Sequence, residues 1–97
     1  MAEKFYFYVL HCADNTLYAG YTVDLEKRLL AHNNGQGAKY TRIKTRQPLR
    51  LIYSESYPTK SLAMQREYHF KQLTRPEKEK FLVTKNVYFN DNKIKKR

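Results

Sequence analysis

The chain has 97 residues, enough for one domain and too few for a second hydrophobic core. Its 19 Lys and Arg against 9 Asp and Glu give a formal net charge of +10, which favours a polyanionic partner, with nucleic acid the first candidate. The single cysteine, Cys12, excludes an intramolecular disulfide and a cysteine-based zinc site, and we expect it to be a small buried side chain. No run approaches the ~20 apolar residues of a membrane span and no secretion signal is evident, so we expect a cytoplasmic protein with no membrane partner.

The first part of the chain predicts a β-hairpin. Residues 4–12 are aromatic and β-branched and carry large side chains on both alternating faces, which is typical of a central strand. Residues 13–16 supply turn-forming side chains, and residues 17–21 return as a second strand. The sequence leaves the register open. If Tyr8 lies opposite residue 20, Tyr8 and Tyr18 share a face, and if it lies opposite residue 21 they point to opposite faces.

Residues 23–33 predict a helix, because Leu25, Leu29 and Leu30 recur at helical spacing between Asp24 and a closing Asn34-Gly35 pair. Residues 34–48 then form a long loop rich in Lys and Arg. Loops of this length are uncommon inside a compact domain and are often functional.

The rest of the chain predicts a third strand over residues 49–57, a second helix over 61–73 and a third helix to about residue 83. Thr74 and Glu77 form a capping box at the start of the third helix. The second helix is expected to turn four side chains toward the core: Leu62, Ala63, Phe70 and Leu73. The order β-β-α-β-α-α predicts an α+β fold with a three-stranded, mainly antiparallel sheet flanked by helices. We expect one domain over residues 4–84 and a flexible basic tail over 85–97, for which a DNA contact is the alternative.

Five side chains are candidates for chemistry: Tyr8, Tyr18, Arg28, His32 and Glu67. Arg28 and His32 are one helical turn apart on the same face, and the rigid donor fork of Arg matches phosphate. The alternative is an exposed Arg beside a hydrogen-bonded His. For the two tyrosines the alternative is packing, because strands favour aromatic residues.

Glu67 is interpreted in two ways. It can form a surface ion pair with Lys71, one helical turn later. It can also be a lone metal ligand, since Mg²⁺ commonly takes only one or two protein carboxylates and fills its other positions with water and phosphate oxygens.

The long loop mixes cations with an aromatic side chain in a glycine-flanked segment. Such a segment can follow a phosphate backbone, with the aromatic ring available to stack or to hydrogen-bond. A solvated surface is the alternative. We predict nucleic-acid contacts from Lys39, Tyr40, Arg42, Lys44 and Arg46.

Several short motifs share an order and spacing that is jointly specific. They are Tyr6-Phe7-Tyr8, Tyr18-Ala19-Gly20, Thr22-x-Asp24-Leu25-x-x-Arg28-x-x-x-His32, the segment Gly37–Arg42, and Arg66-Glu67. Together they resemble the GIY-YIG nuclease family, and the loop segment resembles its small single-domain bacterial members of mostly unassigned role. The Gly-Ile of the first motif is absent, so the choice of Tyr8 over Tyr6 rests on its ten-residue distance from Tyr18.

The resemblance implies a metal-dependent endonuclease that hydrolyses DNA phosphodiester bonds, with DNA repair or recombination as its setting. Glu67 would hold Mg²⁺ or Mn²⁺, and Tyr8, supported by Tyr18, would deprotonate the attacking water. Arg28 would meet charge on the phosphate, and His32, with a pKa near working pH, would accept or relay the proton. Positive charge from Arg28, Lys39 or the metal is expected to lower the pKa of Tyr8.

Two other functions fit the same features. One is a non-catalytic DNA- or RNA-binding module on the same fold, and the other is a protein-interaction adaptor that uses the aromatic face of the sheet. A partner protein for targeting is a further expectation, and the oligomeric state is left open. Catalysis requires the Glu67 carboxylate to lie on the side of the sheet that Tyr8 and Arg28 share.

Overall fold

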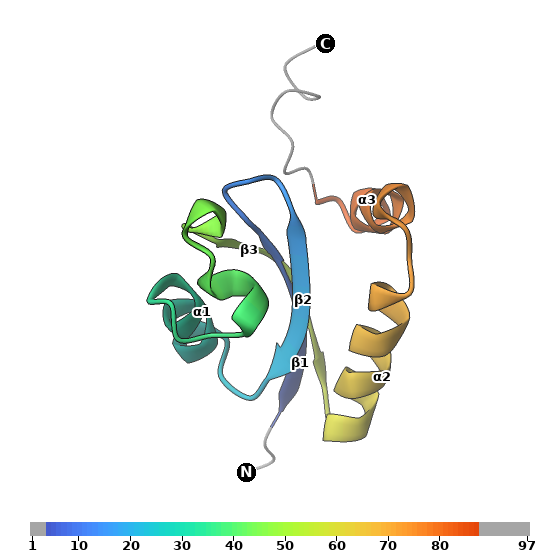
Figure 1. The fold of residues 1–97 in the computed structure, drawn as a ribbon. Coiled ribbons are helices and arrows are strands. Elements are labelled where there is room, and N and C mark those ends of the chain that lie inside the picture. Colours follow the sequence, from blue (N-terminus) through green and yellow to red (C-terminus); the bar gives the residue numbers. More distant parts are fainter. Residues whose placement is uncertain (1–3, 88–97) are drawn as a thin grey trace.

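The computed structural model describes residues 4–87. It confirms the α+β fold and the order of the elements, with an antiparallel sheet of strand order β2-β1-β3 (Figure 1). The strands are β1 (Phe5–His11), β2 (Leu17–Thr22) and β3 (Arg50–Tyr57). The helices are α1 (Leu25–Asn33), α2 (Lys60–Lys71) and α3 (Arg75–Thr84), with two short 3₁₀ turns, η1 (Lys39–Arg42) and η2 (Lys44–Arg46).

β1 is the central strand, as its two bulky faces predict. Phe7 and Val9 point to the side covered by α2 and α3, whereas Tyr8 and Leu10 point to the side covered by α1 (Figure 1). All four side chains are buried. The sheet therefore divides two hydrophobic clusters, and the candidate Tyr8 belongs to the smaller one.

The hairpin register places Tyr8 opposite Gly20 and Leu10 opposite Tyr18. Of the two registers left open by the sequence, this is the one in which Tyr8 and Tyr18 share a face. The turn closes with Asn15 in the left-handed region, at φ 69°, a conformation that asparagine tolerates better than most residues.

α1 starts and stops where its sequence predicts. The Asp24 side chain accepts from the Lys27 backbone N–H at 3.0 Å and caps the first turn. At the other end Gly35 adopts φ 75°, and the N–H groups of Gly35 and Gln36 bond back to the carbonyls of His32 and Ala31. This is a Schellman motif, which glycine favours because it has no Cβ.

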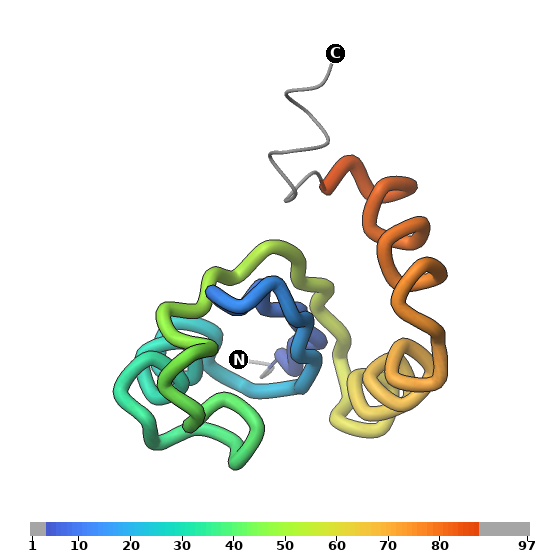
Figure 2. Tube along the Cα trace, turned by 45° about the horizontal axis from the view of Figure 1, so that its top comes forward, coloured from blue at the N-terminus to red at the C-terminus, as the bar shows by residue number. Residues whose placement is uncertain are grey.

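The loop over residues 34–48 is more ordered than an irregular connection. It contains both 3₁₀ turns and folds against α1, as Figure 2 shows. Asn33 clamps its ends, because its side chain donates to the Leu49 carbonyl and accepts from the Leu49 N–H, at 3.1 and 2.6 Å. Arg46 ties it to the hairpin turn through Asp14 at 3.1 Å.

On the other face of the sheet, α2 buries Ala63 and Phe70, as predicted, and Leu73 packs against the cluster that contains Phe70. Leu62 was expected in the core but is 41% exposed. Ala63 and Phe70 are two turns apart on one face, so a residue directly before Ala63 is rotated about 100° away from the sheet. Such a rotation turns Leu62 outward.

The C-terminal part of the described chain confirms the capping box of Thr74 and Glu77 at the start of α3. Val87, within the predicted tail, packs against the Phe7 cluster. The remainder of that tail, residues 88–97, lies outside the described residues. Within residues 4–87, the helices are too short or too polar to cross a membrane.

Candidate active site

The hydroxyl of Tyr8 is the meeting point of two other candidate side chains. Its oxygen lies 2.9 Å from His32 Nε2 and accepts from Arg28 Nε at 3.4 Å. Tyr8 is 2% exposed and His32 is fully buried, whereas Arg28 is partly exposed. Tyr6 lies two residues earlier on β1, opposite Thr22. The contacts therefore favour Tyr8 over Tyr6 as the tyrosine of the first motif.

Two glycines make room for this arrangement. A Cβ on Gly20 would lie 2.6 Å from the Tyr8 hydroxyl oxygen, so the phenol needs a strand partner without a side chain. A Cβ on Gly37 would lie 2.3 Å from His32 Nδ1 and 2.9 Å from its Cα. The glycines of the second motif and of the loop therefore have a steric role at the site.

Thr41 is a member of the cluster that sequence reasoning missed. It is fully buried, and its hydroxyl oxygen lies 2.7 Å from His32 Nδ1 and donates to the Ala38 carbonyl at 2.9 Å. A threonine in a polar loop gives no sign that it is buried. The only signal was its place inside the Gly37–Arg42 segment that carries the family resemblance.

The pKa values of the central pair differ from expectation. Burial raises the pKa of Tyr8 to about 12, and the hydrogen bond from Arg28 offsets only part of that effect. Burial, followed by the charge of Arg28, lowers the pKa of His32 to about 4. The expected low pKa of Tyr8 and near-neutral pKa of His32 are therefore wrong for the protein alone, because desolvation outweighs the nearby positive charge.

Tyr18 borders the cluster and connects it to the loop. Its ring centroid lies 6.4 Å from that of Tyr8, 5.3 Å from that of His32 and 5.7 Å from that of Tyr40, with which it stacks at 26°. The Arg46 guanidinium lies 3.8 Å from the Tyr40 ring centroid, and Arg46 also donates to the Tyr40 carbonyl at 3.0 Å. Tyr40 and Arg46 thus have partners within the protein and organise the loop.

The other three residues predicted to contact nucleic acid present their charges to solvent. Lys39, Arg42 and Lys44 are all exposed. Arg42 donates from Nε to the Gly37 carbonyl at 3.2 Å, which holds the stem of its side chain beside the glycine that abuts His32. These are the loop cations with charge available to a phosphate backbone.

Glu67 lies on α2, which covers the face of the sheet opposite Tyr8 and Arg28, so the helix itself is not on the side that catalysis was expected to require. The ion pair of Glu67 and Lys71 nevertheless reaches the edge strand β2, where Tyr18 faces the same side as Tyr8. The Glu67 carboxylate pairs with Lys71 at 2.8 Å, and the Lys71 ammonium lies 5.5 Å from the Tyr18 ring centroid. The charge of Glu67 is one of the lesser causes that raise the pKa of Tyr8, after burial and Tyr18. The ion pair foreseen as an alternative is present, and it lies beside Tyr18 rather than on a remote surface.

The donor set at this edge is compatible with a hard, hydrated cation. Among residues 4–87, no three or more His, Cys, Asp and Glu side chains gather as metal ligands would. A structural zinc site needs such a group, whereas Mg²⁺ is commonly held by one carboxylate together with water and phosphate oxygens. The Glu67 side chain is 19% exposed and can supply that single carboxylate once its ion pair with Lys71 is broken.

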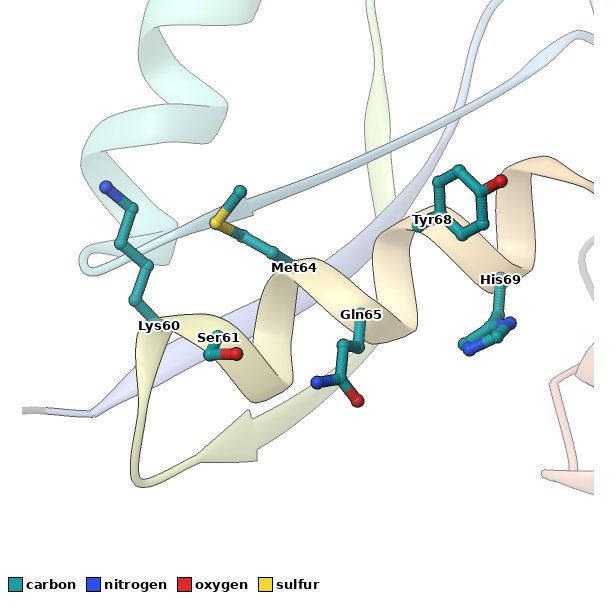
Figure 3. Close-up of a pocket in the computed structure, with 6 residues that line it drawn as sticks. All are labelled: Lys60, Ser61, Met64, Gln65, Tyr68 and His69. Atoms are coloured by element: carbon teal, nitrogen blue, oxygen red, sulfur yellow. The ribbon is translucent and has the colours of Figure 1, made fainter.

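An open hollow of about 660 Å³ follows the outer face of α2 (Figure 3). Its lining includes Lys60, Met64 and Tyr68 but no carboxylate, and Tyr68 is 62% exposed. Met64 in this lining is three residues before Glu67, so the two side chains are neighbours on the surface of α2 and the hollow borders the metal-ligand candidate. A surface without carboxylates is compatible with a polyanion that extends beyond the buried cluster.

Comparisons with known proteins show what the chain as a whole is similar to. A family model described as "GIY-YIG catalytic domain" matches residues 4–80. A "UPF0213 protein" of Limosilactobacillus reuteri is 52% identical over 86 residues, covering 89% of this chain and 90% of the relative. The solution NMR structure of the protein EF2693 from E. faecalis is 46% identical with a TM-score of 0.60, covering 90% of this chain and 91% of that one. The solution NMR structure of the UPF0213 protein BH0048 from Bacillus halodurans is 43% identical with a TM-score of 0.57, covering 84% of this chain and 85% of that one.

Proposed function

Because the chain belongs to the GIY-YIG family of nuclease-type domains, we propose that it is a metal-dependent endonuclease that hydrolyses DNA phosphodiester bonds. The observation that carries the proposal is the contact of Tyr8 with both Arg28 and His32, next to Tyr18, beside which lies the ion pair of Glu67 and Lys71 from α2. A phenol and an imidazole can transfer protons, a guanidinium can stabilise negative charge on phosphate, and a carboxylate can hold a metal ion. DNA repair or recombination is the setting we propose.

Arg28 is the residue that meets the scissile phosphate. Its Nε is engaged by Tyr8, while the side chain stays partly exposed, so the remaining donors of its fork are available to phosphate oxygens. The fork is held in place before substrate arrives. A preorganised donor of this kind stabilises charge that develops in the transition state.

Tyr8 orients the attacking water and takes its proton. As the water oxygen bonds to phosphorus, the bond to the leaving oxygen breaks and that oxygen is protonated from solvent. The proton from the water passes to the Tyr8 oxygen while the Tyr8 hydroxyl proton is transferred to His32 Nε2, within the hydrogen bond that joins these two atoms at 2.9 Å. The negative charge of a bound phosphate favours this transfer, because it raises the pKa of a nearby imidazole.

Glu67 is the residue that we propose to hold Mg²⁺, with Mn²⁺ as a substitute. When bound, the metal polarises the phosphate and stabilises the leaving oxygen. The Lys71 ammonium would then leave Glu67 and pair with a phosphate of the substrate, since it already lies near Tyr18.

The DNA backbone would follow the exposed cations of the loop, Lys39, Arg42 and Lys44, and the face of α2 that begins at Lys60. Such contacts bind phosphate without reading sequence. Structured RNA is a second substrate class that this surface fits, and a partner protein would supply targeting.

The test is a nuclease panel over duplex, single-stranded and branched DNA, each with Mg²⁺, Mn²⁺ or EDTA. Wild type is compared with Glu67→Gln, which keeps the size of the side chain and removes its charge. Glu26→Gln, an exposed position in the first turn of α1, is the matched control. We expect metal-dependent cleavage by wild type and the control and none by Glu67→Gln, with DNA affinity nearly unchanged. Equal cleavage by all three proteins would refute the assignment.

A non-catalytic nucleic-acid-binding module is the second candidate. The pKa values of Tyr8 and His32, about 12 and about 4, favour it because neither group is poised to exchange a proton at neutral pH in the free protein. This candidate predicts salt-dependent DNA or RNA binding, with a log–log slope of about −0.9 per neutralised phosphate, and no cleavage under any metal condition. The same panel separates the two.

A further inference from the structure

Tyr8, His32 and Thr41 form a buried series of hydrogen bonds that ends at the carbonyl oxygen of Ala38. The direction of each bond follows from that carbonyl. A carbonyl oxygen only accepts, so the Thr41 hydroxyl gives its one proton to Ala38 O at 2.9 Å. Its oxygen can then only accept from His32 Nδ1, at 2.7 Å, which places the imidazole proton on Nδ1. A neutral imidazole has one such proton, so Nε2 is bare and accepts the Tyr8 hydroxyl proton at 2.9 Å.

We propose that Thr41 is a positioning residue that fixes His32 in its Nδ1-protonated tautomer and keeps the bare Nε2 aimed at Tyr8. The tautomer is inferred from the hydrogen bond that the Thr41 hydroxyl donates to Ala38 O and from the two distances at the imidazole, independently of the proposed function. Its consequence for the rate rests on the proposed function, which uses Nε2 as the proton acceptor.

Several contacts make Thr41 the part of the site that determines this state. The residue is fully buried, so water has no access to replace its hydroxyl. Its backbone is held on both sides, since the Thr41 N–H bonds to Ala38 O at 3.0 Å and Gln47 Nε2 donates to Thr41 O at 3.0 Å. Gly37 closes the same side of the ring, where any Cβ would collide with His32 Nδ1.

Loss of the Thr41 hydroxyl should favour the other tautomer of His32, in which the proton is on Nε2. A buried Nδ1–H without an acceptor is costly, whereas a proton on Nε2 can be donated to the Tyr8 oxygen. In that state Nε2 no longer accepts a proton from Tyr8 and competes with Arg28 for the phenol oxygen. The loop that carries the exposed cations therefore also sets the proton arrangement at the reacting group, because Thr41 lies between Tyr40 and Arg42.

The tautomer is measured by long-range ¹H–¹⁵N NMR of the imidazole rings at pH 7, in protein without DNA. Bare and protonated ring nitrogens resonate far apart, and His11→Gln and His69→Gln variants assign the His32 signals. We expect wild type and Thr41→Ser to show a bare Nε2 and a protonated Nδ1, and Thr41→Val to shift toward the reverse. Thr45→Val, an exposed threonine of the same loop, is the control that should match wild type.

Cleavage rates provide the second readout. For Thr41→Val we expect kcat to fall at least about tenfold with KM within about twofold, less than the ~10²–10⁴ that a general base supplies. Thr41→Ser should restore most of kcat. A wild-type His32 protonated on Nε2 would overturn the proposal even if Thr41→Val fails to fold. An unchanged rate in a variant whose tautomer has switched would overturn the role of Thr41 in the reaction, while cleavage itself would still support the proposed nuclease.

Discussion

Acid should destabilise this protein in a pH range where its carboxylates are still ionised, because His32 is buried without a charge. Its pKa is about 4 in the folded protein against an ordinary value of 6.5, so the unfolded chain binds the proton more readily. The stabilisation is complete above pH 6.5 and is lost as the pH falls toward 4. The gap between the two pKa values corresponds to roughly 3 kcal/mol, of which about 2 kcal/mol is lost between pH 7 and pH 5.

Urea unfolding at pH 7, 6 and 5 measures this loss directly, in wild type and in His32→Gln. The glutamine variant does not titrate at this position, so its free energy of unfolding should change by about 2 kcal/mol less than that of wild type over the same range. Its lower stability at pH 7 does not affect the comparison, which depends on the slope. His69→Gln, at an exposed position of α2, should keep the wild-type slope. If His32→Gln and wild type lose the same stability between pH 7 and pH 5, His32 is not held neutral by burial.

Four further substitutions test other parts of the structure. Gly35→Ala should lower the free energy of unfolding by about 1–2 kcal/mol, since φ 75° is strained for a residue with a Cβ. Denaturant midpoints measure this loss. Glu55→Leu should lower the free energy of unfolding by about 1–3 kcal/mol at pH 7, because the hydroxyls of Tyr53 and Tyr57 and the Arg66 guanidinium all donate to that carboxylate. A calorimetric melting point equal to that of wild type would count against this prediction. In a salt titration of DNA affinity, Lys44→Ala should reduce the magnitude of the log–log slope by about 0.9 if this exposed lysine meets a phosphate. Arg46→Ala should instead mainly lower the free energy of unfolding, because Arg46 is bound to Asp14 and Tyr40.

The sequence predicted the fold well because local signals agreed with the tertiary structure. The two bulky faces of β1 required cover on both sides, and α1 was bounded by the Asp24 cap and by Gly35. The hairpin register was open, since strand patterning allows both alternatives. Gly20 opposite Tyr8 resolves it, because the phenol lies where a Cβ would be.

The candidate residues Tyr8, Arg28 and His32 lie together in the structure, but their electrostatic environment was not predicted. Helical spacing was enough to place Arg28 and His32 together, yet the depth of burial, which sets both pKa values, depends on the fold of the loop over them. The same dependence concealed Thr41. Tyr40 and Arg46 looked like ligands for nucleic acid, whereas each has partners inside the protein, because loop composition does not distinguish a cation that faces solvent from one that anchors the chain.

In the proposed nuclease, the pKa gap between Tyr8 and His32 keeps the proton on Tyr8 until substrate arrives. Moving the proton from a group with a pKa of about 12 to one with a pKa of about 4 costs roughly 11 kcal/mol. Across the 2.9 Å between the two atoms, attraction between the resulting phenolate and imidazolium returns about 6 kcal/mol at an effective dielectric constant of 20, so the transfer remains unfavourable in the free protein. A bound phosphate next to Arg28 shifts the balance, because its negative charge stabilises the imidazolium. On this account the buried pair holds its proton on Tyr8 between turnovers, and substrate binding supplies the field that releases it.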